Sequence, residues 1–184
     1  EKVQIVTHGD RSTFIVGPIN LPVQLDGETV FFKWYSWLDV QMIEGMQAED
    51  QVEELIKSLP QANLANNQQS SVLVYGDFEH AEDALIRMHS ICHTGDIFGS
   101  KRCDCGFQLK QSMKMISEHG AGALFYLANH EGRGIGLFSK ALAYLLQEEG
   151  LDTVVANEHL GFGDDSRNYD EAIRVLKTLR KLPV

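Results

Sequence analysis

Residues Phe107–Leu127, FQLKQSMKMISEHGAGALFYL, decide the fold class. Within them, Phe107–Glu118 spaces its apolar side chains three and four residues apart, which is the period of one helix face, and Gly120 ends the pattern. Ala123–Leu127 follows as a short, continuous apolar run typical of a buried strand. Because a buried strand needs a sheet and an amphipathic helix needs a surface to cover, this stretch predicts a domain that combines the two.

The rest of the second half repeats this alternation of helix and strand patterns. We expect strands at Ser71–Tyr75, Ala84–Met88 and Thr153–Ala156, and helices at Gly134–Gln147 and Tyr169–Lys181. At the start of the last helix, Asn168 and Glu171 have the N-cap and N3 spacing of a capping box, with Asn in place of the usual Ser or Thr.

The first half has a more purely β character. We expect strands at Thr13–Val16 and Val30–Phe32, a helix at Val40–Leu59, and an Asn/Gln/Ser-rich connector at Gln61–Ser71. Pro60 ends the helix because proline interrupts the helical hydrogen-bond ladder. Together the two halves predict an α+β (mixed α/β) fold, in which one domain has a central mixed β-sheet flanked by helices.

The charge distribution indicates the kind of ligand. The net charge is −10, but residues 87–140 hold seven basic and four acidic side chains. An acidic protein with a local basic region suits a small phosphorylated ligand better than a nucleic acid, although chance clustering would give the same count. The longest apolar runs are too short for a membrane span, and no secretory leader is visible after Glu1. We therefore expect a cytoplasmic protein with neither nucleic-acid nor membrane partners.

All three cysteines, Cys92, Cys103 and Cys105, fall within one short stretch. An odd, tightly spaced set does not make a disulfide framework, whereas thiolates bind zinc strongly. Cys105 also precedes a predicted helix, whose positive end favours a thiolate. Three ligands leave a fourth position for water, as in catalytic zinc sites, but His89 or His93 would close the site into a structural one. The spacing alone leaves both alternatives open.

These cysteines lie in a longer run, RMHSICHTGDIFGSKRCDCG, from Arg87 to Gly106. This run resembles the zinc signature of the GTP cyclohydrolase II family. The resemblance covers about residues 72–182, with a weaker likeness at Leu21–Phe32, and it includes Gln108, the EGRGIGL segment Glu131–Leu137, and Leu160–Arg167.

The resemblance implies a role for each matching residue. It implies that one zinc ion is held by Cys92, Cys103 and Cys105, with the open position supplying the water that attacks C8 of the guanine. It implies GTP contacts from Arg87, Met88, His89, Ser90, Gln108, Glu131, Gly132, Arg133 and Thr153. It implies catalytic roles for Asp165 and Arg167, as base and nucleophile at the α-phosphate, and for Tyr144 in ring opening. Without the family match, Asp165 and Arg167 would be read as a loop ion pair and Tyr144 as a core residue.

The implied reaction is the first step of riboflavin synthesis. Diphosphate leaves GTP with the help of Mg²⁺, formate leaves from C8, and the product is 2,5-diamino-6-ribosylamino-4(3H)-pyrimidinone 5′-phosphate. The resemblance also implies a homodimer. It predicts a single domain over residues 1–184, with a β-rich part at 1–70 that carries a helical insertion at about 40–59, and a zinc- and GTP-binding core at 71–184.

Two departures from the family pattern open alternatives. Ile91 stands where the family usually has Glu. This difference suggests an alternative function, a related GTP hydrolase with a different product, for example a formylated one. The family also continues, beyond the residue that matches Val184, into a Thr-Asn-Asn-Pro segment with a nucleotide-contacting lysine, and we expect this segment to be missing here. A non-catalytic zinc module that binds nucleotides is the third interpretation, and it predicts a fourth protein ligand to the metal.

Overall fold

The two longest strands of this computed structural model, which describes residues 3–41 and 48–183, form a hairpin. They are β2 (Arg11–Leu25) and β3 (Glu28–Gln41), joined by Asp26 and Gly27 with φ values of 48° and 90°. Positive φ at both central residues is the geometry of a type I′ turn, whose twist matches that of the flanking strands. Both strands predicted in the first half lie inside this hairpin.

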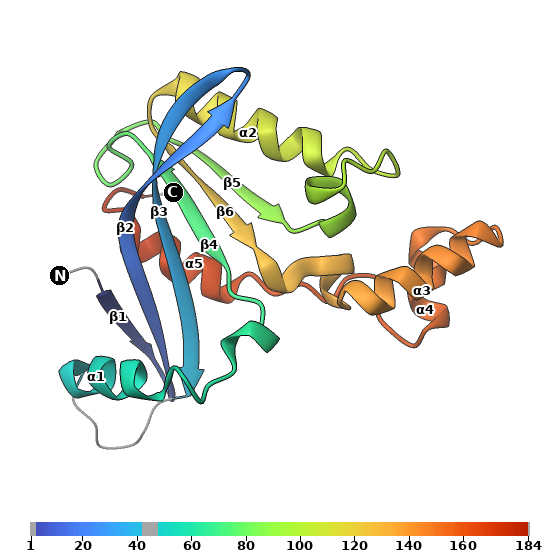
Figure 1. Cartoon of the computed structure of the whole chain (residues 1–184), viewed down its shortest axis with the longest axis horizontal. Coiled ribbons are helices and arrows are strands. Elements are labelled where there is room, and N and C mark those ends of the chain that lie inside the picture. The colour runs from blue at the N-terminus through green and yellow to red at the C-terminus, as the bar shows by residue number, and fades with distance from the viewer. Residues whose placement is uncertain (1–2, 42–47, 184) are drawn as a thin grey trace.

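Six strands form one mixed sheet in the order β1-β2-β3-β4-β6-β5 (Figure 1). The remaining four are β1 (Val3–His8), β4 (Ser71–Tyr75), β5 (Leu85–Ser90) and β6 (Gly122–Leu127). Neighbouring strands run antiparallel except β5 and β6, which are parallel. The predicted mixed sheet is therefore confirmed, and three of the strands predicted in the second half correspond to β4, β5 and β6.

Helices cover both faces of the sheet because β6 alternates its buried side chains between two cores. On one face, Ala123 and Phe125 pack with α5 (Asp170–Leu179). On the other face, Leu124 packs with α2 (Cys105–His119). The α+β fold is confirmed, and the predicted helix before β6 packs directly on that strand.

The strand predicted at Thr153–Ala156 is wrong, because these residues begin α4 (Thr153–His159). Asp152 accepts a hydrogen bond from the backbone N–H of Val155 at 2.9 Å and so acts as the N-cap. A side-chain cap satisfies an N–H group that a strand would have to pair with a neighbour. The cap thereby overrides the β propensity of the β-branched run at the start of the helix.

The helix predicted at Val40–Leu59 is only partly correct. Val40 belongs to β3, where it pairs with Ser12 of β2, so sheet pairing extends the strand into the predicted helix. Residues 42–47, on which part of the helical pattern fell, lie outside the described residues. The helix that the structure describes, α1, covers Ala48–Ser58.

The helix predicted at Gly134–Gln147 begins later than expected, as α3 (Leu137–Glu148). Gly134 and Gly136 have φ values of 90° and 89°, which lie outside the α-helical region, so α3 cannot include them. Shorter helical turns lie at Leu64–Asn66, His93–Ile97 and Ala128–Gly134.

The capping box predicted for the last helix is wrong, although the helix itself is confirmed as α5. The Asn168 side chain accepts a hydrogen bond from the N–H of Asp170 at 2.8 Å and does not cap α5. The Glu171 carboxylate accepts one from Trp37 Nε1 at 3.1 Å. Because Trp37 is buried in the core, this bond draws Glu171 toward β3 and fixes α5 on the sheet.

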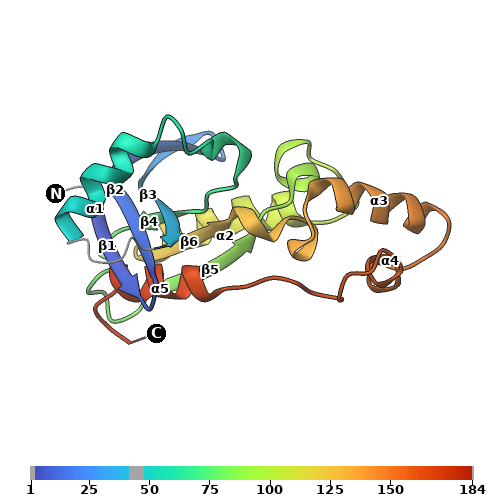
Figure 2. The ribbon, with the colours of Figure 1, turned by 90° about the horizontal axis from the view of Figure 1, so that it is seen from below.

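Residues 137–159, comprising α3, α4 and their link, form an arm that projects from the sheet (Figures 1 and 2). Residues 160–169 then return the chain to α5. The arm exposes large apolar side chains, such as Phe138 at 79% and Leu145 at 59%. Among the helices of the described residues, none combines the length and apolar character that a bilayer crossing requires.

Candidate metal centre and adjoining cleft

Two loops that carry the predicted site residues leave the sheet at one edge because β5 and β6 are parallel (Figure 1). Ser90 and Leu127 are paired at the carboxyl ends of these strands. The loop after β5 leads to the cysteines, and the loop after β6 leads to the turn Glu131–Gly136. Ligands of open α/β sheets commonly bind at the carboxyl ends of parallel strands, so this edge is the expected place for a site.

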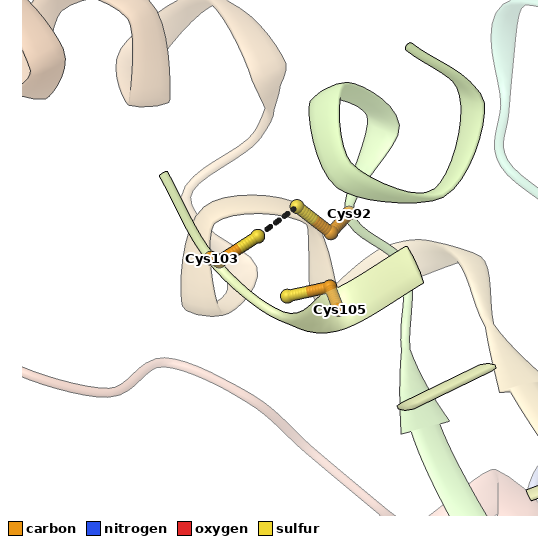
Figure 3. A group of neighbouring side chains, drawn as sticks. All are labelled: Cys92, Cys103 and Cys105. Carbon is orange, nitrogen blue, oxygen red and sulfur yellow. Dashed lines mark hydrogen bonds between the residues drawn. The ribbon is translucent and has the colours of Figure 1, made fainter. Parts of the chain in front are cut away.

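Three sulfur atoms meet at this edge (Figure 3). Cys92 lies just beyond β5, Cys103 lies in the following loop, and Cys105 is the first residue of α2. Their Sγ atoms lie within 4.8 Å of one another, and those of Cys92 and Cys103 are 3.6 Å apart. Such spacing is too long for a disulfide, whose S–S bond is about 2.05 Å. It suits thiolates that share one metal ion at about 2.3 Å each.

Gly95 keeps the space beside these sulfurs free. A Cβ atom at this position would lie 2.9 Å from Cys103 Sγ and 3.2 Å from Cys92 Sγ. Burial raises the pKa of the Cys105 thiol, and its contact with Cys103 and the negative charge on Cys92 raise that pKa further. A divalent cation would remove this repulsion, since coordination to it deprotonates a thiol. The donor set therefore fits a zinc ion.

In the part of the chain that the structure describes, no histidine joins the three cysteines. His89 lies 3.2 Å from the Asp96 carboxylate through Nε2, and its ring stacks on Tyr126. The His93 ring packs edge-on against Phe98, with ring centroids 5.0 Å apart. Three protein ligands is the number that catalytic zinc sites use.

Two buried carboxylates hold the backbone at the first cysteine. Asp96 accepts a hydrogen bond from the N–H of Cys92 at 3.0 Å, and Glu131 accepts one from the N–H of His93 at 2.7 Å. Glu131 also pairs with Lys140 Nζ at 2.6 Å, and this ammonium group lies 3.1 Å from Cys92 Sγ. Sequence reasoning gave Asp96 and Lys140 no role. The available signal for Lys140 was an isolated lysine on the apolar face of a predicted helix.

A cleft of about 340 Å³ opens beside the sulfurs. This volume falls within the usual range for small-molecule sites, about 300–1,000 Å³. The predicted site residues that line it are Ser90, Cys92, Cys103, Cys105, Gly132, Arg133, Tyr144, Thr153 and Arg167. The fold thus brings the cysteine loop, the glycine-rich turn, the arm and the segment before α5 around one space.

The other predicted site residues do not line this cleft; they are Arg87, Met88, His89, Gln108, Glu131 and Asp165. Met88 packs toward the core under α5, whereas Arg87 faces α2 and donates a hydrogen bond to Gln108 Oε1 at 2.6 Å. Alternate residues of a strand point to opposite faces. The Arg87–Ser90 strand therefore cannot present four side chains to one ligand.

The glycines of the turn Glu131–Gly136 allow close packing within the protein itself. A Cβ atom at Gly134 would lie 2.8 Å from the backbone oxygen of Ser166, and one at Gly132 would lie 3.1 Å from Lys140 Cβ. Gly132 is also one of the GTP contacts that the family resemblance implies. The close contacts in the structure are instead with α3 and with the segment that carries Arg167.

Arg167 joins the segment before α5 to the end of β5. Its Nε donates to the Asp165 carboxylate at 2.9 and 3.1 Å, and its Nη1 donates to Ser90 Oγ at 3.4 Å. Ser90 Oγ is 2.9 Å from His130 Nδ1, and His130 Nε2 is 2.8 Å from the Asn168 carbonyl oxygen. A carbonyl only accepts, so Nε2 carries a proton, and burial lowers the pKa of His130 and keeps Nδ1 free to accept. The Ser90 hydroxyl therefore donates to His130 and accepts from Arg167.

The arm residues Tyr144 and Thr153 are placed by polar neighbours. The Arg102 guanidinium, from the cysteine loop, lies 4.0 Å from the centre of the Tyr144 ring, within cation–π range. Arg102 also donates to Glu148 at 3.1 Å, which fixes the loop on α3. Thr153 Oγ1 accepts from Gln147 at 3.4 Å at the start of α4. Tyr144 is thus a cleft residue and not the core residue that an isolated helix pattern would suggest.

Asp165 is expected to stay ionised at every pH above about 4. The hydrogen bond from Arg167 lowers the pKa of Asp165 to about 2. Because the folded pKa lies below the unfolded value of about 3.9, the pair stabilises the fold above that pH and loses this effect as pH falls through the folded pKa. A carboxyl ¹³C titration should show a midpoint near about 2, and Arg167→Gln should return it toward about 3.9. A wild-type midpoint near the unfolded value would contradict this ion pair.

The chain is thus a mixed α+β domain in which three thiols that could hold a metal ion lie beside a cleft lined by arginines. The family model described as GTP cyclohydrolase II matches residues 59–181. Since this match covers more than half of the chain, the chain belongs to the GTP cyclohydrolase II family.

Curated relatives agree with this membership. The riboflavin biosynthesis protein RibBA of Parabacteroides distasonis is 50% identical over 119 residues, which is 65% of this chain and 29% of that protein. The probable bifunctional riboflavin biosynthesis protein RIBA 1 of Oryza sativa is 50% identical over 64% of this chain and 22% of its own length. The GTP cyclohydrolase-2 of Archaeoglobus fulgidus is 55% identical over 53% of this chain and 26% of its own length. The chain thus spans less than a third of each of these relatives.

Proposed function

We propose that this chain carries GTP cyclohydrolase II activity, hydrolysing GTP with release of formate from C8 and of diphosphate. The observation that carries the proposal is the three-thiol centre without a fourth protein ligand among the described residues, beside a cleft that Arg167 also lines. The expected product is 2,5-diamino-6-ribosylamino-4(3H)-pyrimidinone 5′-phosphate, the first intermediate of riboflavin synthesis. We also propose a homodimer, in keeping with the exposed apolar side chains of the arm.

Cys92, Cys103 and Cys105 would hold the zinc ion. Zinc with an open position lowers the pKa of water from 15.7 to about 7 and so supplies hydroxide at neutral pH. Tyr144 lines the same cleft, within reach of a ligand that lies beside the sulfurs. Its position under the Arg102 guanidinium favours a role in orienting the purine during ring opening.

The arginines of the cleft suit the triphosphate of GTP. Arg102, Arg133 and Arg167 all line the cleft. A guanidinium can pair with a phosphate through two parallel N–H groups. The described residues offer no second group of histidines and carboxylates for a metal. Mg²⁺ would therefore arrive on the phosphate oxygens, which it prefers to protein ligands.

We propose that Arg167 acts at the α-phosphate. Asp165 accepts from its Nε and Nη2, and Ser90 accepts from its Nη1, so the guanidinium is held from two sides. Ser90 can accept a proton from Nη1 only if it passes its own proton to His130, and the hydrogen bonds run in that direction. Asp165 is a weak base because its pKa is about 2, so its main role is to orient Arg167.

A related GTP hydrolase with a different product is the second candidate, and Ile91 favours it. Ile91 lines the cleft between Ser90 and Cys92. An isoleucine offers no hydrogen bond to substrate, where the family's usual glutamate would offer a carboxylate. Loss of such a contact would change how the opened ring is held after C8 is attacked.

Incubation with GTP, Mg²⁺ and Zn²⁺ tests the proposal. Formate and diphosphate should appear in equal amounts, and mass spectrometry should find the diaminopyrimidinone product. A matched sample with ATP should release neither, and one stripped of zinc should release no formate. Diphosphate with a formylated product would support the second candidate. If GTP remained intact, both candidate hydrolase functions would be wrong, and the chain would be a zinc module without catalytic activity.

A further inference from the structure

The Lys140 side chain lies beside the three cysteines and contacts the Cys92 sulfur without belonging to the cysteine group. Its ammonium group is 2.6 Å from Glu131 Oε1 and 3.1 Å from Cys92 Sγ. Lys140 is only 8% exposed, and Glu131 is 1% exposed. A buried ammonium is costly unless it is paired, so the two negative neighbours account for its presence there.

Glu131 closes a ring of contacts around the first cysteine. Its Oε1 accepts from Lys140, and its Oε2 accepts from the N–H of His93, the residue after Cys92. The ring therefore runs from the Cys92 sulfur through Lys140 and Glu131 back to the backbone of the same loop. Asp96 holds the preceding amide, the N–H of Cys92, at 3.0 Å. Both amides of the Cys92–His93 segment are thus fixed by carboxylates.

Lys140 reaches this position because the glycine-rich turn lets α3 pack closely. A Cβ atom at Gly132 would lie 3.1 Å from Lys140 Cβ, so a larger residue would push the helix away. One helical turn further along α3 is Tyr144, whose ring centre is 5.7 Å from Lys140 Nζ. The same lysine thus ties the cysteine loop to the helix that carries a predicted catalytic side chain.

We propose that Lys140 is a positioning residue of the metal centre, an inference that rests on the proposed function. Its fixed positive charge faces the Cys92 sulfur and, through Glu131, fixes the backbone that aims this sulfur at the metal. Without it, the Glu131 carboxylate and the Cys92 thiolate would repel each other in a buried space. Partners that orient a ligand in this way commonly change metal affinity by about 10- to 100-fold.

The test is zinc affinity measured by competition with a chromophoric chelator, without GTP. Lys140→Met, which keeps the length and apolar stem, should bind zinc about 10- to 100-fold more weakly than wild type. Lys114→Met is the matched control, because Lys114 is exposed and pairs with Asp26 far from the cysteines. This control should keep wild-type affinity. With Co²⁺ in place of zinc, the thiolate charge-transfer bands of Lys140→Met should also weaken or shift.

A double variant guards against a simple loss of fold. Glu131→Gln combined with Lys140→Met removes both buried charges and should fold even if the single variant does not. Its zinc affinity should also fall. Wild-type affinity in either folded variant would overturn the role of Lys140. A wild-type chain that binds zinc but leaves GTP intact would contradict only the proposed function.

Discussion

Replacing Cys103 with alanine should reduce formate release from GTP by at least about a thousandfold, because water without a metal keeps a pKa near 15.7 instead of about 7. Two sulfurs would remain, and they do not make a zinc site of the usual three or four protein ligands. Formate in single-turnover reactions and bound zinc by mass spectrometry measure the two effects. Both should disappear together.

The fold of this variant should persist. Cys103 lies at the cleft and belongs to neither hydrophobic core of the sheet. The matched control is Lys101→Ala, an exposed change in the same loop, which should keep both zinc and formate release. If Cys103→Ala unfolded the chain, the metal would be structural and the catalytic interpretation of the site would be wrong.

Arg167→Lys should reduce diphosphate release by at least about a hundredfold while bound zinc stays at the wild-type level. Lysine keeps the positive charge but loses the planar fork that bonds Asp165 and reaches Ser90. The group aimed at the α-phosphate would therefore be lost without disturbing the sulfurs. Rapid-quench assays of diphosphate, with zinc analysis of the same sample, measure the effect.

Arg11→Lys provides the control for this change. Arg11 also pairs with an aspartate, Asp39, but on the far strands β2 and β3. It should leave diphosphate release unaltered. Wild-type diphosphate release by Arg167→Lys would mean that Arg167 only shapes the loop, as an ordinary ion pair before a helix would.

Strands β4, β5 and β6 and the two covering helices could be predicted from apolar runs and from a helical period, whereas β1 was not predicted and β2 and β3 only in part. Ser71–Tyr75 and Ala123–Leu127 are interior strands with a neighbour on each side, and both are largely apolar in sequence. The N-terminal part of α4 could not be predicted in this way. There a single cap from Asp152 decides the local structure against the propensity of several β-branched residues.

The clustering of the three cysteines could be predicted from their spacing, but the surroundings of the site could not. Glu131 and His93 lie 38 positions apart and meet only because β5 and β6 are parallel neighbours. His89 carried a predicted contact with GTP, yet it points to the face opposite Met88 and bonds Asp96. Which face a strand residue takes depends on the register of the whole sheet, which no local motif contains.

X-ray absorption at the zinc edge tests the central claim most directly. The zinc-loaded chain should show three sulfur neighbours at about 2.3 Å and one oxygen neighbour at about 2.0 Å, without imidazole scattering. Four protein ligands around the ion, or a chain that retains no zinc, would contradict the proposed hydrolytic centre.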